Sequence, residues 1–293
     1  MTTLYNFQKL EAEKNAIIVQ SQTTSLLSEP GLEALSIQRS IMSTITRFSN
    51  FLGEMSKRIT FGLSDDKQKN MPHSHEDKAL LRQLSTAMEK GNYIDLMELR
   101  VQVVPGLSTT WDNQLDSWEG PIGMAVNFYD LYLLPFQKFL AIAVNDPEKF
   151  TTVNTVMSAK DVDVAGYHAA LTNPLSGNTK TNLRSYKDCT SRNLDTIDVF
   201  NRSIEYAASM NSSNLRLVKD AVNDVSRLLG ILSQQIVDYN LGYRLNAKTI
   251  SDLSDYTFQL AKITELYGVT YAYVSSQKEA MIQTAHKLVK VVR

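Results

Sequence analysis

Residues 253–292 read LSDYTFQLAKITELYGVTYAYVSSQKEAMIQTAHKLVKVV, and this stretch decides the fold class. From Leu253 onward, residues that suit one helix face recur in alternating steps of four and three. This heptad spacing is the pattern that lets one α-helix pack along another. It predicts a helix over 247–292, roughly 65–70 Å long at 1.5 Å per residue. The members that we assign to this seam are Leu253, Leu260, Tyr267, Tyr271, Val274, Met281 and Leu288.

The seam is not wholly apolar, because Thr257, Thr264 and Lys278 interrupt it. Polar residues at such positions set the register or mark where a partner's polar groups arrive. If Lys278 only snorkels from the seam, with its stem along the apolar surface, Lys278→Leu should be tolerated or should stabilise the seam.

A matching apolar stripe runs from Leu215 to Tyr239, upstream of a short loop at 242–248. Asn246 is a plausible cap for the helix that follows this loop. The short connection predicts an antiparallel, coiled-coil-like hairpin at the C-terminal end of the chain. Its apolar surface exceeds what two helices need, so part of it should pack on the N-terminal heptad helix or on a second subunit.

The N-terminal part of the chain carries the same helical spacing. Residues 32–60 form a second heptad seam, and an upstream helix is predicted over roughly 2–28. The residues that we assign to this seam are Ile41, Ile45, Phe48, Leu52 and Met55. Further helices are predicted at about 76–90, in a short segment that ends before Pro105, and at 122–144 with a kink at Pro135.

Glycine and proline are scarce, at 12 and 7 residues, so the chain lacks the turn signals of a strand-rich protein. We therefore predict an all-α fold, an elongated helical bundle. The clearest linker is 159–178, which contains Asn173-Pro174 and Ser176-Gly177. It divides an N-terminal helical region, 1–158, from a C-terminal helical hairpin or bundle, 179–293. We find no repeat of fixed length in the sequence.

Composition narrows the class of protein. A formal net charge of −1 over 293 residues argues against a dedicated nucleic-acid binder. Cys189 is the only cysteine, which excludes an internal disulfide and favours a reducing compartment. The N-terminal residues lack the pattern of a secretory signal peptide. The most apolar stretch, 123–144, contains Asp130, Lys138 and Pro135, so we expect a buried helix rather than a membrane span.

The stretch MPHSHEDKAL, residues 71–80, places His73 and His75 one residue apart, beside Glu76 and Asp77. Two histidines with nearby carboxylates could bind zinc, but no distal ligands are evident. Ser74 followed three residues later by Asp77 instead resembles a capping box ahead of an apolar run. We favour the helix start over a metal site, and we expect no bound cofactor.

Other candidate motifs are weak. Residues 174–181, PLSGNTKT, depart from the phosphate-loop pattern and are interpreted as a loop before a helix. Cys189 has Lys187 and Arg192 nearby but no assignable base, so we do not assign it as a nucleophile. Trp111 and Trp118 lie in a stretch, 105–121, that we expect to be irregular. We favour a role for them in plugging the end of a bundle over one as anchors for a partner.

Frequent Ser, Thr, Asn and Tyr with a single Cys resemble the composition of many virion or assembly proteins of tailed bacteriophages. The resemblance implies a non-enzymatic structural part of an oligomeric particle, made in the host cytoplasm and incorporated in a virion. Its partners would be other protein subunits, as a homo-oligomer or a larger assembly. The alternatives are a cytoplasmic helical adaptor or effector and, with less support, an enzyme with a dispersed site.

Overall fold

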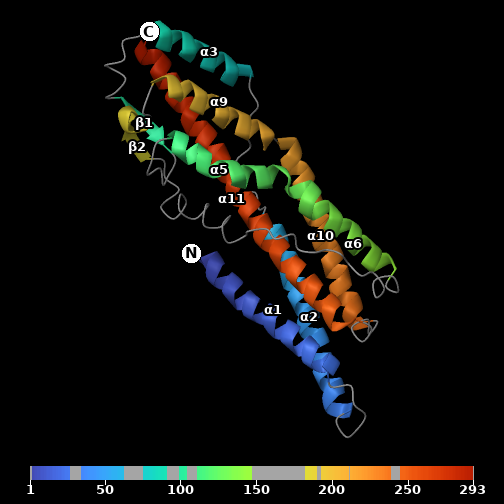
Figure 1. Cartoon of the computed structure of the whole chain (residues 1–293). Helices are drawn as coiled ribbons and strands as arrows, with labels where there is room; N and C mark the ends of the chain where they lie inside the picture. Colours follow the sequence, from blue (N-terminus) through green and yellow to red (C-terminus); the bar gives the residue numbers. More distant parts are fainter. Residues whose placement is uncertain are drawn as a thin grey trace. The chain divides into compact units, whose positions relative to one another are not determined.

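The computed structural model describes residues 2–26, 34–62, 75–90, 99–103, 111–146, 182–189, 193–210, 212–238 and 245–292 (Figure 1). Almost all of these residues lie in helices, so the predicted all-α class is confirmed. The elongation of the bundle and the antiparallel hairpin stay predictions. The described helices are divided between two compact units of the chain.

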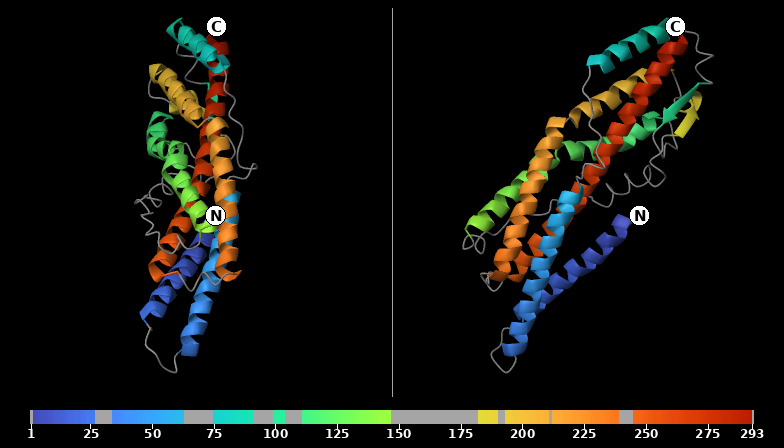
Figure 2. Two further views of the ribbon diagram at one scale, coloured as in Figure 1. Left: turned by 90° about the vertical axis from the view of Figure 1, so that its right-hand side faces the viewer. Right: turned by 180° about the vertical axis from the view of Figure 1, so that it is seen from behind.

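The first unit contains the two N-terminal helices, a π-helical turn and the helix that follows this turn, together with parts of two later helices. These elements are α1 (Thr2–Leu26), α2 (Ala34–Gly62), η2 (Tyr129–Leu133), α6 (Leu134–Asn145), most of α10 (Ser212–Asp238) and the beginning of α11 (Ala247–Val292). Figure 2 shows α1 and α2 next to each other in both of its views. The bounds of α1, α2 and α11 lie within two residues of the predicted ones.

The second unit contains three helices, the C-terminal part of α11 and a short ribbon of two strands. The elements are α3 (His75–Lys90), β1 (Arg100–Val103), α5 (Trp111–Val126), β2 (Asn182–Ser185), the 3-10 turn η3 (Tyr186–Asp188) and α9 (Asn193–Ser209). Their buried side chains form one apolar cluster, which includes residues of α3, α5, α9 and α11.

The first turn of α11 is capped as the sequence predicts. The backbone N–H of Thr249 donates to Oδ1 of Asn246 at 2.8 Å, and the Thr249 hydroxyl donates to the same oxygen at 3.0 Å. The N–H of Ile250 bonds to the Asn246 carbonyl oxygen at 3.1 Å. Asn246 thereby satisfies one of the free N–H groups at the helix start, and its role as the cap is confirmed.

The predicted helix over 122–144 is interrupted before its proline. α5 ends at Val126, and the wider π-helical turn η2 precedes α6, whose first turn holds Pro135. Proline lacks an N–H, and its ring clashes with the carbonyl four residues earlier. A widened turn relieves this conflict, which gives the interruption a physical cause.

No helix among the described residues is long and apolar enough to cross a membrane.

A two-stranded antiparallel ribbon lies in the second unit, with Arg100 opposite Ser185 and Val103 opposite Asn182. A helix was expected immediately before Pro105, and for Arg100–Val103 that expectation is wrong. Val101 and Val103 alternate with polar residues, which is the spacing of a strand with one buried face. Val101 is fully buried.

The expectation of irregular structure over 105–121 is also wrong from Trp111 onward, because α5 begins there. α5 continues through both Gly120 and Pro121. A Cβ atom at Gly120 would meet nothing within 4 Å, so this glycine is not required by close packing. The stretches 159–178 and 174–181 lie outside the described residues, and the predicted division into domains therefore stays a prediction.

Candidate interaction seams

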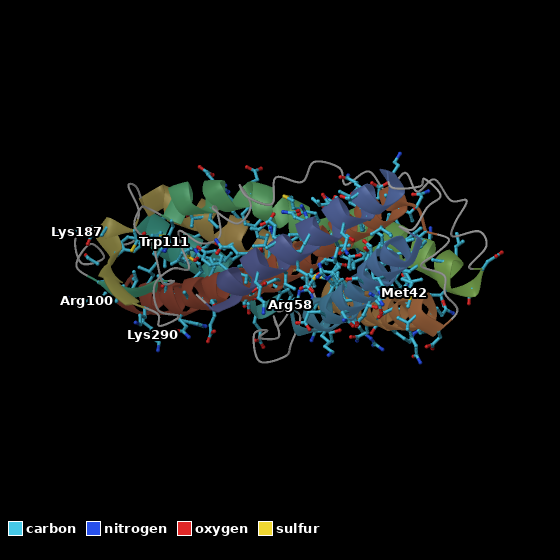
Figure 3. All side chains as sticks on the ribbon, turned by 90° about the horizontal axis from the view of Figure 1, so that it is seen from below. Met42, Arg58, Arg100, Trp111, Lys187 and Lys290 are labelled. Carbon is cyan, nitrogen blue, oxygen red and sulfur yellow. The ribbon has the colours of Figure 1, made fainter. Side chains whose placement is uncertain are left out.

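The predicted seam of α2 is buried in the first unit. Ile45, Phe48, Leu52 and Met55 are all at most 4% exposed, whereas Ile41 at the beginning of the seam is half-buried. Met42, next to Ile41, is 41% exposed and is labelled in Figure 3. A single chain therefore covers Ile45, Phe48, Leu52 and Met55.

The seven seam residues assigned to α11 are buried as well, each at most 4% exposed. They lie in both units, because α11 contributes its first part to one unit and its last part to the other. In the second unit the ring of Tyr267 stacks on Phe128, with 5.3 Å between ring centroids. Stacking of two aromatic rings stabilises the folded state beyond the effect of burying their apolar surface.

Of the three residues that interrupt this seam, Thr264 is fully buried and donates to the carbonyl oxygen of Leu260 in its own helix, at 2.7 Å. A hydroxyl bonded to the preceding turn is satisfied without a partner helix. For Thr264, the interpretation as a point where a partner's polar group arrives is therefore not needed.

Two reciprocal serine pairs join α2 to α10 in the first unit. Ser49 Oγ donates to the Ser233 carbonyl oxygen at 2.8 Å, and Ser233 Oγ donates to that of Ser49 at 2.9 Å. Ser56 and Ser226 repeat this exchange at 3.0 and 2.9 Å. Because the residue number rises on α2 where it falls on α10, the two helices are antiparallel. The chain's own N-terminal heptad helix thus covers part of α10, as one of the two predicted arrangements requires.

The serine pairs belong to a longer pattern that both helices share. Residues 49–59, SNFLGEMSKRI, and 226–236, SRLLGILSQQI, agree at the positions SxxLGx(M/L)SxxI. The apolar members of the two copies are all fully buried, namely Leu52, Met55, Ile59, Leu229, Leu232 and Ile236. A Cβ atom built on Gly53 would lie 3.7 Å from Ser233 Oγ, which indicates close approach of the helices. We call this contact the SxxLG contact.

A buried lysine connects α1 to α11 in the first unit. Lys14 Nζ lies 2.8 Å from Asp255 Oδ1, and the Lys14 side chain is 9% exposed. The same ammonium lies over the ring of Phe258, 5.0 Å from its centroid, and Lys262 approaches that ring at 4.5 Å. The carboxylate and the aromatic face both offset the cost of removing the Lys14 charge from water.

Tyr256 of α11 contacts the π-helical turn. Its hydroxyl donates to the carbonyl oxygen of Tyr132 at 2.8 Å, and its ring lies 4.7 Å from that of Phe136. Burial raises the pKa of Tyr256, and the nearby Tyr132 adds a smaller electrostatic contribution in the same direction. Burial raises the pKa of Tyr132 also. Tyr256 therefore helps to satisfy the backbone at the point where the α-helical ladder is interrupted.

A second polar network joins α6 to α10. Gln137 Nε2 donates to Asp224 Oδ2 at 2.6 Å, and Arg227 bonds to the other oxygen of the same carboxylate. These hydrogen bonds, that of Gln137 first, lower the pKa of Asp224. Gln235 Nε2 donates to the Val144 carbonyl oxygen at 3.3 Å, further along the same two helices.

In the second unit a buried ion pair joins α3 to α11. Lys278 Nζ lies 2.7 Å from Asp77 Oδ2, and the two side chains are 9% and 14% exposed. Lys278 therefore does not only snorkel from the seam, because its ammonium is held by a carboxylate of another helix, and the condition for a tolerated Lys278→Leu is not met. Asp77 was singled out for a capping box with Ser74, which lies outside the described residues.

The first tryptophan lies in the apolar cluster of the second unit. Trp111 is 1% exposed, and its ring lies 6.1 Å from Tyr186 and 5.8 Å from Phe200 (Figure 3). Its backbone N–H donates to the carbonyl oxygen of Cys189 at 2.9 Å. The side chain of Trp118 lies outside the described ones. This placement makes Trp111 a core residue that connects α5, η3 and α9.

The remaining candidate residues occupy ordinary structural places. Cys189 is fully buried, and its thiol lies 3.4 Å from the Ser185 carbonyl oxygen. His75 is the first residue of α3 and is exposed, with Glu76 and Asp77 beside it in the first turn, while His73 lies outside the described residues. In the described part of the chain, no three His, Cys, Asp or Glu residues are grouped as metal ligands.

An exposed ion pair, Arg202 with Asp116, links α9 to α5. Hydrogen bonding to Asp116, and then to Tyr206, raises the pKa of Arg202. Such exposed pairs contribute little to stability.

Comparison of the chain with protein-family models, with curated proteins and with solved structures finds no match.

Sequence reasoning missed the long-range polar contacts and the SxxLG contact. One signal was present, because Ser49 and Ser56, like Ser226 and Ser233, are seven residues apart and share one helix face. The partners of Lys14 and Lys278 carry no such signal, because each lies on a helix remote in sequence.

Proposed function

We propose that this protein is a non-enzymatic structural or assembly component of an oligomeric particle, with a bacteriophage virion as the most fitting context. The observation that supports the proposal is that charged and polar side chains of the described residues form contacts between helices. Lys14 with Asp255, Lys278 with Asp77, and the serine pairs of the SxxLG contact each join two helices. We interpret these polar contacts as structural, because each of them holds two helices together.

Under this proposal, exposed apolar side chains would take part in the contacts between subunits. Among the described residues, the exposed large apolar side chains are Val19, Met42, Val126, Leu131, Ile142, Leu217, Val237 and Val291. Single exposed apolar residues are common on monomeric proteins, so none marks an interface alone. A subunit contact would bury several of them together.

Light scattering and cryo-electron microscopy of the purified full-length chain test this proposal. We expect a discrete oligomer, or co-assembly with capsid or tail proteins that are expressed together with it. A chain that stays monomeric at high concentration and joins no such particle would contradict the proposal.

A paired set of variants then maps the contact. Lysine at both Leu131 and Ile142, which are 49% and 47% exposed, should dissociate the oligomer if this surface of η2 and α6 is involved. Lysine at Val237, 50% exposed on α10, is the matched control for added charge. Circular dichroism should show unchanged helix content in both variants.

A second candidate is a helical adaptor that acts as a monomer. The burial of the predicted seams within one chain favours it, because those residues are then not available to a second subunit. The mass of the purified protein separates the two candidates directly. The adaptor would remain monomeric and would bind one partner with fixed stoichiometry.

A further inference from the structure

The contact of α3 with α11 in the second unit combines one buried ion pair with an apolar face. Lys278 Nζ and Asp77 Oδ2 lie 2.7 Å apart, at 9% and 14% side-chain exposure. The apolar residues of α3 share a cluster with those of α11, α9 and α5. Figures 1 and 2 show α3 beside the C-terminal end of α11 in every view. The two kinds of contact constrain α3 differently.

The apolar face repeats itself along each helix. On α3 the buried positions Leu80, Leu84 and Met88 follow one another in steps of four residues. On α11 the buried positions Met281, Ala285 and Val289 do the same. A displacement of α3 by one turn, about 5–6 Å along its axis, would again place apolar groups against apolar groups. Because hydrophobic contact is non-directional, this face alone distinguishes neighbouring registers weakly.

The ion pair does not repeat. In a register displaced by one turn, the apolar Leu81 would take the place of Asp77 opposite Lys278. A buried ammonium would then lose its carboxylate, and burial of an uncompensated charge is strongly unfavourable. Polar groups at single seam positions are known to select one register at some cost in stability.

We propose that the Asp77–Lys278 ion pair sets the register of α3 on α11 and contributes conformational specificity more than stability. With the pair replaced by apolar residues, α3 retains its affinity for α11 but occupies more than one axial position. With the charges exchanged, the single position returns.

Spin labels on two exposed residues measure this position. Thr86 on α3 and Glu205 on α9 are both exposed in the second unit, whereas Cys189 is fully buried. Double electron–electron resonance on full-length Thr86→Cys/Glu205→Cys should give one distance peak. Adding Asp77→Leu and Lys278→Met should broaden or split that peak, with a spread comparable to one helical turn. Adding Asp77→Lys and Lys278→Asp instead should restore one narrow peak at the original distance.

Thermal unfolding followed by circular dichroism accompanies each measurement. The apolar double variant should keep its helix content and melt at the same or a higher temperature than the parent. One unchanged peak in that variant would overturn the proposal, since the apolar face would then define the register. Loss of helix content or a large fall in melting temperature would overturn it also, because the pair would then serve stability. A charge-exchanged variant that stays broad would contradict a role for the pairing itself.

Discussion

Ser56 and Ser226 each donate a side-chain hydrogen bond to the other's backbone carbonyl oxygen, at 3.0 and 2.9 Å. Their hydroxyl oxygens are 2.9 Å apart. Such a reciprocal exchange requires two helix backbones to approach closely, so only small side chains fit between them. The SxxLG contact therefore depends on side-chain volume at these positions more than on the hydrogen bonds.

Enlarging one serine tests this dependence. Ser56→Leu should destabilise the first unit by about 1–3 kcal/mol, because added methylenes force the helices apart. The double change of Ser56 and Ser226 to Ala should cost less, since alanine still fits between the helices and only the two hydroxyl donors are lost. Urea unfolding gives both values. Asn50→Leu, at an exposed position of α2, is the control and should leave the midpoint unchanged.

Removal of the Lys278 ammonium alone should be strongly unfavourable. Lys278→Leu leaves the carboxylate of Asp77, whose side chain is 14% exposed, without its cation. Loss of one member of a buried pair costs about 3–5 kcal/mol. Chemical unfolding of the variant measures the loss, with Lys287→Leu at an exposed position as control. A Lys278→Leu variant as stable as the parent would show that the pair is better solvated than its burial indicates.

A carboxylate in the seam of α11 should prevent correct folding of the first unit. Leu260 is 1% exposed, so Leu260→Asp buries a charge without a partner and should cost several kcal/mol. Leu217→Asp, at 45% exposure on α10, is the matched control and should melt like the parent. Equal melting temperatures for the two variants would mean that α11 is not packed as described.

Replacing an exposed helical glycine should stabilise the protein. Gly230 lies within α10, and a Cβ atom there would meet nothing within 4 Å. Alanine restricts the unfolded chain and favours the helix by about 0.5–1 kcal/mol. Differential scanning calorimetry of Gly230→Ala should show a higher melting temperature. A lower one would reveal a contact at this face that requires glycine.

The raised pKa of Tyr256 predicts a loss of stability in alkali. In the unfolded chain this phenol ionises around its ordinary pKa of 10.0, whereas burial keeps it neutral in the folded protein to higher pH. The stabilisation that comes from burying the neutral Tyr256 phenol is therefore complete below about pH 10. It declines as the pH rises above that value. Tyr256→Phe should cost about 1 kcal/mol near neutral pH through the lost hydrogen bond to Tyr132.

The difference in the free energy of unfolding between the parent and Tyr256→Phe should then become smaller at alkaline pH. Urea midpoints measured at neutral pH and well above the pKa of free tyrosine give this comparison. A gap between the two proteins that stays constant over this range would mean that Tyr256 ionises equally in both states.

Local signals in the sequence account for the parts of the fold that were predicted correctly. The heptad spacing of α11 and the Asn246 cap depend on residues a few positions apart, so the pattern alone indicates them. The π-helical turn before Pro135 was expected only as a kink, because sequence does not specify how a helix relieves a proline clash. The ribbon of β1 and β2 pairs residues that are 79 to 85 positions apart in the chain, and neither segment indicates the other.

The long-range polar contacts could not be predicted from the sequence for a related reason. Lys278 occupies a seam position, and a lysine there is compatible with a solvated ammonium or with a buried one. The choice depends on Asp77, which is 201 residues away in the chain. Spacing within one helix predicts which face is covered, but it does not identify the covering helix.

The SxxLG contact has one more consequence, which concerns choice of partner. Its two halves present the same residue types in the same order, so the contact has the approximate dyad of an isologous dimer within a single polypeptide. Inside the pattern, neither helix distinguishes the other from a copy of itself. Selection of α10 by α2 must then come from the covalent chain, which raises the effective concentration of the intramolecular partner above that of any neighbour.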